Sequence, residues 1–187
     1  MLLVRIVTVP PMPAGTESDL ARRLADLYKQ HSPQVYTLCL RLSGDAGLAE
    51  ELAQDAWVRI WRKLPALRRD DDAGGWIHRV TTNVVLNDRR ATRRRVARVA
   101  LSADLSGGLP ESAEANRAPF ATPTPIRRID LLAAISRLGG RQREAYVLHD
   151  IEGLTDRDIA DRLRIAPSTV RVLLARARAT LRDILRP

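Results

Sequence analysis

The chain has 187 residues, a formal net charge of +9 and a sequence pI of about 11.0. Hydrophobic residues make up 45% of it, with Ala and Leu prominent and few aromatics, so the chain can bury a core and favours helices over strands. No apolar run reaches the length of a membrane span, and a single cysteine excludes an internal disulfide.

Arginine dominates the positive charge, since only Lys29 and Lys63 are lysines. Its planar guanidinium binds phosphates and guanine edges with paired hydrogen bonds, which indicates a nucleic-acid partner. A genome rich in G and C would raise the arginine content as well. The positions of the arginines along the chain must decide between these two explanations.

Residues 1–16 are expected to form a disordered N-terminal extension. Three prolines interrupt this segment, and its short apolar opening contains Arg5. Because it also lacks a small-residue cleavage pattern, it is a poor match to a signal peptide.

The first helical block covers residues 17–99 and begins with apolar residues at helical spacing on both sides of Pro33. This pattern predicts two antiparallel helices, because a proline inside a helix removes a hydrogen bond and clashes with the preceding turn. Cys39 lies between two leucines, which indicates a buried thiol in a reducing compartment, the cytoplasm.

Another helix is predicted between the turn at Gly44 and the helix breaker Pro65. Its apolar stripe consists of Leu48, Leu52, Ala56 and Ile60. The opposite face carries Glu50, Glu51, Gln54 and Asp55. This acidic face in a basic protein indicates either a basic partner surface or a solvated first turn favoured by the helix dipole.

A further helix is predicted after Gly74 and Gly75, and it runs into the strongly basic segment 89–98. This segment has six arginines in ten residues and no acid. Like charges at this density repel one another along a bare helix, whereas a phosphate backbone alongside would relieve the repulsion. The segment therefore favours nucleic-acid binding over a solvated basic tail.

Residues 100–127 are predicted to form a flexible linker, because Ser, Gly and Pro accumulate there without helical periodicity. A second helical block follows over residues 128–187. The predicted fold class is therefore all-α, with two small helical domains joined by a linker.

The end of the second block has helix-turn-helix spacing. Thr155 and Asp158 have the form of a capping box, Ala160 allows two helices to approach closely, and Pro167 opens a second helix after a short turn. That helix would lie in the major groove of DNA, where side chains near its N-terminal end reach base edges. These side chains are Ser168, Thr169, Arg171, Val172, Ala175 and Arg176.

Catalytic machinery is not indicated by the sequence. The three histidines lie far apart, the lone cysteine has no partner, and no Gly-rich phosphate loop occurs. We therefore expect no enzymatic activity, no metal site and no cofactor.

Three segments together resemble the extracytoplasmic-function (ECF) group of the sigma-70 family of RNA polymerase sigma factors. They are residues 49–61 (AEELAQDAWVRIW), residues 76–83 (WIHRVTTN) leading into the arginine run, and residues 141–178 with the helix-turn-helix. The resemblance implies a sigma region 2 helical bundle over residues 17–99 and a sigma region 4 domain over residues 128–187. It also implies a transcription initiation subunit that works when docked on core RNA polymerase.

The resemblance further implies roles for single residues. The acidic helix would dock on the clamp helices of the largest polymerase subunit through Glu51, Gln54, Asp55 and Trp61. The promoter element nearer the start site would be opened, and its non-template strand held, by Trp76, Asn83, Arg89, Arg90, Arg93 and Arg94. The helix-turn-helix would bind the distal promoter element as duplex, and an anti-sigma factor would hold the protein inactive.

The sequence departs from the family pattern in the helix-turn-helix. Arg164 stands where Gly is usual, so a non-Gly residue is expected to adopt positive φ at a cost of about 1 kcal/mol. Val172, Leu173 and Ala175 also differ from the usual residues. Base contacts should therefore rely on the arginines of this helix and on apolar contact with thymine methyl groups.

Two other functions stay open at this point. A free-standing helix-turn-helix regulator would explain residues 128–187, but it would leave the acidic face and the basic segment without a role. A general RNA or single-strand binder would show an affinity that falls steeply with salt and ignores sequence.

Overall fold

The computed structural model describes residues 14–68, 72–104 and 126–186, with side chains for 18–68, 72–98 and 131–186. These residues form helices, and no strand occurs among them. The elements in chain order are α1 (Ala14–Ser43), α2 (Ala46–Lys63), η1 (Leu64–Ala66), α3 (Ala73–Asp104), α4 (Ile126–Ser136), α5 (Gly140–Tyr146), η2 (Val147–Ile151), α6 (Asp156–Leu163) and α7 (Pro167–Leu185).

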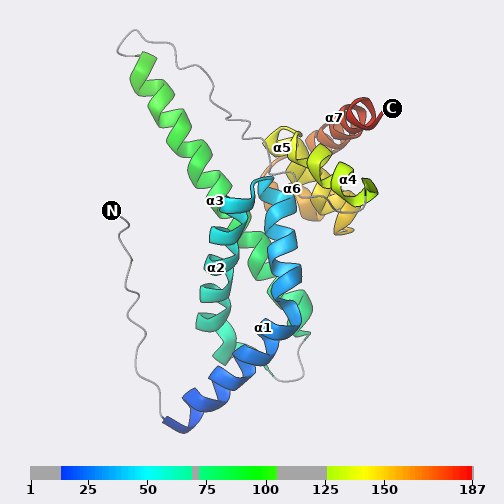
Figure 1. Ribbon diagram of the computed structural model, residues 1–187. Coiled ribbons are helices and arrows are strands. Elements are labelled where there is room, and N and C mark those ends of the chain that lie inside the picture. Colours follow the sequence, from blue (N-terminus) through cyan, green and yellow to red (C-terminus); the bar gives the residue numbers. More distant parts are fainter. Residues whose placement is uncertain (1–13, 69–71, 105–125, 187) are drawn as a thin grey trace.

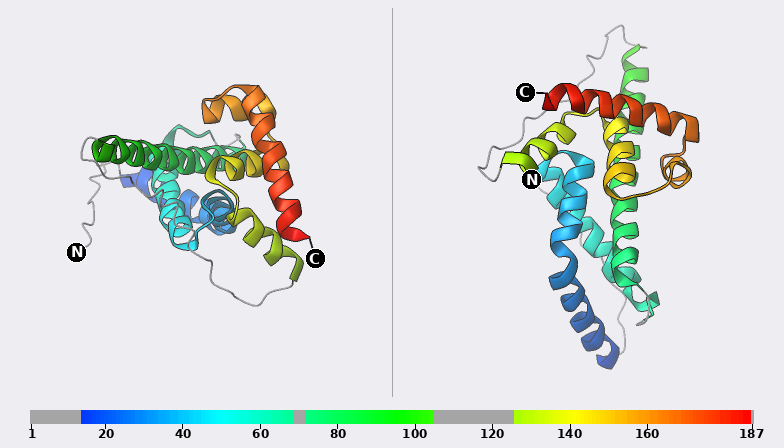
Figure 2. Two further views of the ribbon diagram at one scale, coloured as in Figure 1. Left: turned by 90° about the horizontal axis from the view of Figure 1, so that it is seen from above. Right: turned by 90° about the vertical axis from the view of Figure 1, so that its right-hand side faces the viewer.

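The predicted all-α class with two helical blocks is confirmed. The first block, α1 to α3, is an elongated bundle, and the second block, α4 to α7, gathers at one end of it (Figure 1). In Figure 2, α7 lies crosswise to α1 and α3. The buried apolar side chains of the two blocks belong to one continuous cluster, and α1 contacts both α4 and α5. The second block therefore rests directly against the first.

The helix ends differ by a few residues from the predicted block boundaries. Because α1 begins at Ala14, residues 14–16 of the expected disordered extension are helical. α3 continues to Asp104 and α4 begins at Ile126, so each reaches into the predicted linker. The rest of the predicted extension and linker lies outside the described residues.

α1 is a single helix of 30 residues, so the expectation of two antiparallel helices divided at Pro33 was wrong. The helix changes direction along its length without ending (Figure 1). Val35, Leu38 and Leu42 follow the proline and are buried in the core, where α1 packs against α2 and α3. This packing stabilises the helix across the turn that the proline weakens.

Cys39 is fully buried in α1, as its leucine neighbours predicted. Burial raises the pKa of its thiol to about 12, because the thiolate would lose its hydration. The side chain therefore packs as a small apolar group and stays protonated at neutral pH.

α2 begins and ends where local chemistry predicts. The Asp45 carboxylate accepts a hydrogen bond from Leu48 N at 2.8 Å and so caps the first turn, while Pro65 opens the single turn η1 that ends the helix. Of the predicted apolar stripe, Leu52, Ala56 and Ile60 are buried, whereas Leu48 is half-buried and its neighbour Ala49 is buried instead.

α3 carries the basic segment on a helix. It begins at Ala73, slightly before the two glycines, and Asp72 Oδ1 accepts a hydrogen bond from Gly75 N at 3.0 Å. Ile77, Val80 and Val84 bury the first half of α3 in the core. The second half projects beyond the bundle (Figure 1).

α6 and α7 form the predicted helix-turn-helix. Thr155 Oγ1 accepts a hydrogen bond from Asp158 N at 3.2 Å and caps α6, and Pro167 occupies the first turn of α7. Ala160 and Val170 are buried, in agreement with the close helix approach that the sequence predicts.

The turn between these helices contains the expected strained residue. Arg164 has φ 55° and ψ 54°. Among the described residues it is the one residue other than glycine whose φ is positive. This left-handed conformation brings the Cβ of an L-residue close to its own backbone, at a cost of about 1 kcal/mol.

Replacing Arg164 by glycine should raise the melting temperature. The Arg164→Gly change removes the Cβ strain, which outweighs the added freedom of the unfolded chain, so we expect a gain of about 0.5 kcal/mol or about 2 °C. Calorimetry measures this shift. The control Asp161→Gly puts glycine at an exposed position inside α6 and should lower the melting temperature. A decrease for both variants would show that the turn is not strained.

Candidate functional site

The acidic side chains in the first half of α2 are exposed, as predicted. Glu51, Gln54 and Asp55 are exposed, and Trp61 is half-buried two turns further on. Gln54 and Asp55 follow Glu51 by three and four residues, and Trp61 follows Gln54 by seven. This spacing places the four side chains on one side of the helix. The structure thus brings together the side chains assigned to polymerase docking, and the docking role itself stays a prediction.

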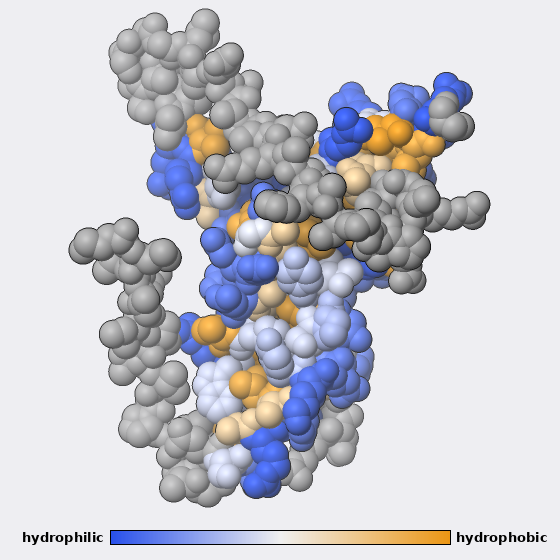
Figure 3. Space-filling view, in the orientation of Figure 1, coloured by the Kyte–Doolittle hydropathy of each residue, from blue (hydrophilic) through white to orange (hydrophobic). Residues whose placement is uncertain are grey.

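Val58 lies within this face and was missed by the sequence reasoning. Hydrophobic side chains are scattered among hydrophilic ones on the face seen in Figure 3. Among the described residues, Val58 is one of a few large hydrophobic side chains that are exposed, at 43%. It lies one turn from Gln54, Asp55 and Trp61. An apolar centre with a polar rim is the arrangement of a protein interface. The sequence signal was that Val58 falls outside the inward stripe of α2.

The residues assigned to the promoter element nearer the start site divide between two faces of α3. Asn83 and Arg94 are exposed, and the half-buried Trp76 lies on the same face, because whole turns separate the three. The other three are half-buried and reach toward the second block: Arg89, Arg90 and Arg93. The predicted single DNA-binding surface is therefore split in this arrangement of the blocks.

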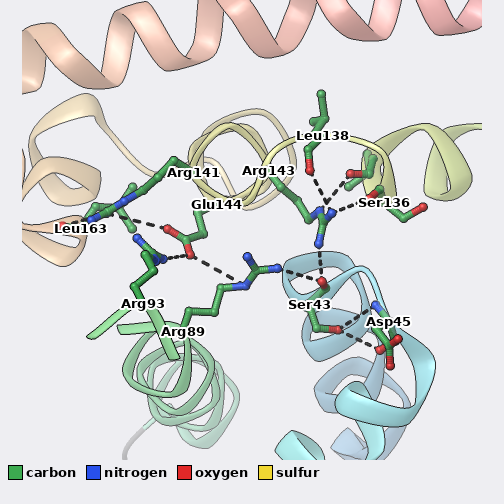
Figure 4. Close-up of polar contacts among 11 residues, drawn as sticks. Ser43, Asp45, Arg89, Arg93, Ser136, Leu138, Arg141, Arg143, Glu144 and Leu163 are labelled. Carbon is green, nitrogen blue, oxygen red and sulfur yellow. Dashed lines mark hydrogen bonds and ion pairs between the residues drawn. The ribbon is translucent and has the colours of Figure 1, made fainter. Parts of the chain in front are cut away.

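A buried carboxylate in α5 holds two of these arginines (Figure 4). The Glu144 side chain is 0% exposed, Arg93 donates a hydrogen bond to its Oε1, and Arg89 Nε lies 3.8 Å from the same oxygen. Arg141 Nη1 lies 3.9 Å from Oε2. Burial raises the pKa of Glu144, and the positive charges of Arg93, Arg89 and Arg141 oppose this rise. Sequence reasoning did not assign a role to Glu144.

Arg143, the neighbour of Glu144, joins the ends of two helices. It donates hydrogen bonds to the Ile135 and Leu138 carbonyls at 3.0 and 2.9 Å, and also to the Ser43 carbonyl at the end of α1. Arg89 Nη2 donates to the same Ser43 carbonyl at 2.8 Å (Figure 4). Carbonyls at a helix end have no partner within the helix, so these guanidinium groups cap α1 and the end of α4 together.

A second polar link joins the blocks through Glu152. His78 Nε2 lies 2.8 Å from Glu152 Oε2, and Arg41 Nη1 lies 3.4 Å from Oε1. The side chain of Glu152 is 15% exposed. The hydrogen bonds from His78 and the nearby Arg41 lower the pKa of Glu152, despite its partial burial.

The recognition helix α7 offers all of its predicted base-reading side chains to solvent. The exposed residues are Ser168, Thr169, Arg171, Val172, Ala175 and Arg176. On the other side of α7, Asp150 accepts two hydrogen bonds from Arg178, at 2.6 and 2.9 Å, and these lower the pKa of Asp150. This paired contact positions α7 against η2.

The described part of the chain shows neither a metal-binding cluster nor a membrane-spanning helix. Over residues 18–68, 72–98 and 131–186, no group of three or more His, Cys, Asp or Glu side chains is placed to hold a metal ion. His78 and His149 instead contact carboxylates. None of the helices with described residues is long and apolar enough to cross a membrane.

Two family models match the chain: Sigma-70 region 2 over residues 27–95, and Sigma-70, region 4 over residues 128–181. The ECF RNA polymerase sigma factor SigE of Mycolicibacterium smegmatis is 36% identical over 167 residues, which cover 86% of this chain and 60% of SigE. SigL of Mycobacterium tuberculosis is 29% identical over 171 residues, 90% of this chain and 92% of SigL. The chain spans about half the length of several other relatives, such as 44% of SigG of M. tuberculosis.

A solved structure shares the fold. It is the sigma factor RpoE in complex with the anti-sigma factor NepR from Bartonella quintana, with a TM-score of 0.57 and 22% identity. The match covers 88% of this chain and 98% of that one.

The Glu152 link should give the melting temperature a defined pH dependence. The lowered pKa means that the carboxylate stabilises the fold above pH 4.5, the ordinary glutamate value, and loses this effect as the pH falls through the lowered value. Glu152→Gln should therefore lower the melting temperature at neutral pH by about 2–4 °C, equivalent to about 1 kcal/mol. In strong acid the two proteins should melt together.

Thermal melts of both proteins from neutral to acid pH test this expectation. Glu50→Gln serves as the control, because it makes the same chemical change at an exposed position of α2. A wild-type advantage that persists unchanged in strong acid would contradict the assignment of the charge to the His78 and Arg41 contacts.

Proposed function

The chain belongs to the ECF group of the sigma-70 family, and we propose that it directs core RNA polymerase to a specific set of promoters. Sigma factors are non-enzymatic initiation factors, so the polymerase supplies the chemistry. The observation that carries the proposal is the presence, on one chain, of an exposed acidic face with an apolar centre and an exposed basic recognition helix. We place this activity in the cytoplasm.

The proposed division of labour follows the two blocks. Region 2, over residues 17–99, would dock on the clamp helices of the polymerase through the acidic face of α2. The carboxylates there suit a basic partner, and Val58 would supply apolar burial at the centre of the contact.

Promoter opening is assigned to α3. Asn83 is exposed and can donate to and accept from the edge of a flipped base, and Trp76 lies on the same face. Arg94, about three turns beyond Asn83 on the same face, would hold the phosphates of the non-template strand together with Arg89, Arg90 and Arg93.

The distal promoter element is assigned to α7 of region 4, over residues 128–187. Arg171 and Arg176 would read base edges in the major groove, and Val172, 48% exposed, suits contact with a thymine methyl group. Two modules joined by residues 100–127 would allow two separated elements to be bound at once.

Control by an anti-sigma factor is part of the proposal. RpoE of Bartonella quintana, which shares the fold, is found in complex with its anti-sigma factor NepR. We infer that a partner of this kind covers the docking face or the DNA-binding surfaces of this chain as well.

Adding the purified chain to sigma-free core polymerase should produce discrete transcripts from a genomic library. The double variant Gln54→Ala and Asp55→Ala should lower core affinity about tenfold or more, because it removes a hydrogen-bonding group and a negative charge that flank Val58 on the docking face. Asp26→Ala, at an exposed acid of α1, should leave core affinity unchanged. Sequence-specific binding to bare duplex without any binding to core would instead favour the free-standing regulator.

Substitutions in α7 should separate the reading of bases from the sequence-independent electrostatic attraction to DNA. Arg171→Ala should weaken recognition of the distal element by about 1–3 kcal/mol and relax the preference for the bases that it contacts. Arg182→Ala, also exposed but far from the N-terminal end of α7, should change promoter use little. Transcription by the reconstituted polymerase from promoters randomised in the distal element measures both effects. Equal losses for the two variants would argue against the assigned groove contact.

A further inference from the structure

The junction between the two blocks contains a carboxylate where the proposed function needs DNA phosphates. We propose that Glu144 is an internal competitor for promoter DNA, which binds Arg89 and Arg93 in the free protein and keeps it closed. This inference rests on the proposed function, because that function assigns the two arginines to the non-template strand.

The closed arrangement occupies three of the four arginines assigned to that strand. Arg93 donates to Glu144, Arg89 is shared between Glu144 and the Ser43 carbonyl, and Arg90 donates to the Arg162 carbonyl in α6. Each guanidinium therefore points at a group that accepts hydrogen bonds as a phosphate oxygen does. A DNA strand and the second block cannot bind the same donors at once.

Two glycines leave room for arginine side chains that cross the junction between the blocks. A Cβ atom at Gly140 of α5 would overlap the Arg89 guanidinium of the first block, and one at Gly44 would overlap the Arg143 guanidinium of the second block. Gly44 also has φ 73°, which favours glycine by itself, whereas Gly140 lies in the first turn of a helix, where alanine fits well. The space at Gly140 is therefore filled by the end of the Arg89 side chain, which a methyl group there would displace from its place beside Glu144.

The polar contacts around Glu144 are incomplete, so a polyanion could compete with Glu144 for the arginines. Glu144 Oε2, Arg93 Nη1 and Arg162 Nη1 are buried without a hydrogen-bond partner. A buried polar network with unmet groups stabilises closure less than a complete one would, because each such group has lost water without replacement. Burial also raises the pKa of Glu144, which indicates the same cost for the carboxylate.

Closure would limit binding at wrong sites. A chain with a net charge of +9 attracts DNA of any sequence, and each arginine that is withheld reduces the number of phosphates it can neutralise. Docking on the polymerase and the presence of an opened promoter strand would then release the arginines where they are needed.

Energy transfer within the full-length chain measures closure directly. Fluorophores are attached at Lys29→Cys in α1 and Asp183→Cys in α7, both exposed positions, and buried Cys39 does not compete for the label. Glu144→Gln and Gly140→Ala, each made in the labelled chain, should both lower the transfer efficiency. The matched controls are Glu50→Gln and Gly139→Ala, because the latter position has room for a Cβ.

Binding of the same chains to a fluorescent single strand of thymidines measures the released arginines. Glu144→Gln should raise the affinity about tenfold, and Gly140→Ala about threefold, relative to their controls at low salt. Two additional phosphate contacts should also steepen the slope of log affinity against log salt by about 1.4. Circular dichroism confirms that each variant keeps its helices, and the glycine variant tests the idea without changing any charge.

The outcomes separate this inference from the proposed function. Unchanged transfer efficiency in both variants would overturn the inference, while promoter-specific transcription with core polymerase would still stand. Lower transfer efficiency without a gain in strand affinity would also overturn it. That result would show that Arg89 and Arg93 do not bind the strand once they are released. Lower efficiency together with higher affinity in both variants is the expected result.

Discussion

A charged carboxylate cannot lie in a site that solvent does not reach unless cations surround it, and this constraint organises the junction between the blocks. Glu144 has lost its water, and Arg89 and Arg93 from one block and Arg141 from the other replace it. The adjacent Arg143 uses the same junction to cap the ends of α1 and α4. The two blocks are therefore joined by charged contacts as well as by the apolar cluster beneath them.

The distribution of charge follows from this arrangement. Acidic side chains stand on the exposed face of α2, while the arginines assigned to DNA lie on α3 and α7, so the surfaces assigned to protein and to DNA are separated on one molecule. Arg89 and Arg93 of α3 meet an internal carboxylate, and the proposed function gives them an external phosphate as a second partner. In the proposed mechanism, the position of the second block determines how much of this positive charge a nucleic acid can reach.

Features set by a few neighbouring residues could be predicted from the sequence. The cap at Thr155 and the positive φ of Arg164 depend on local backbone chemistry, so their residue types were sufficient. The break expected at Pro33 failed for the opposite reason. A local helix breaker was outweighed by the burial of α1 against two other helices, which no short window of sequence contains.

The sequence by itself determined the helical class, the helix-turn-helix and the candidate surfaces, because periodicity and capping are short-range properties. Only the tertiary structure decided which side chains meet. Arg89 and Arg94 look alike within the basic segment, yet one faces the second block and the other faces solvent. Glu144 looked like an ordinary helix acid, and its burial depends on α3, which lies far away in the sequence. Contacts between distant segments follow from how whole helices pack, and local patterns do not encode that packing.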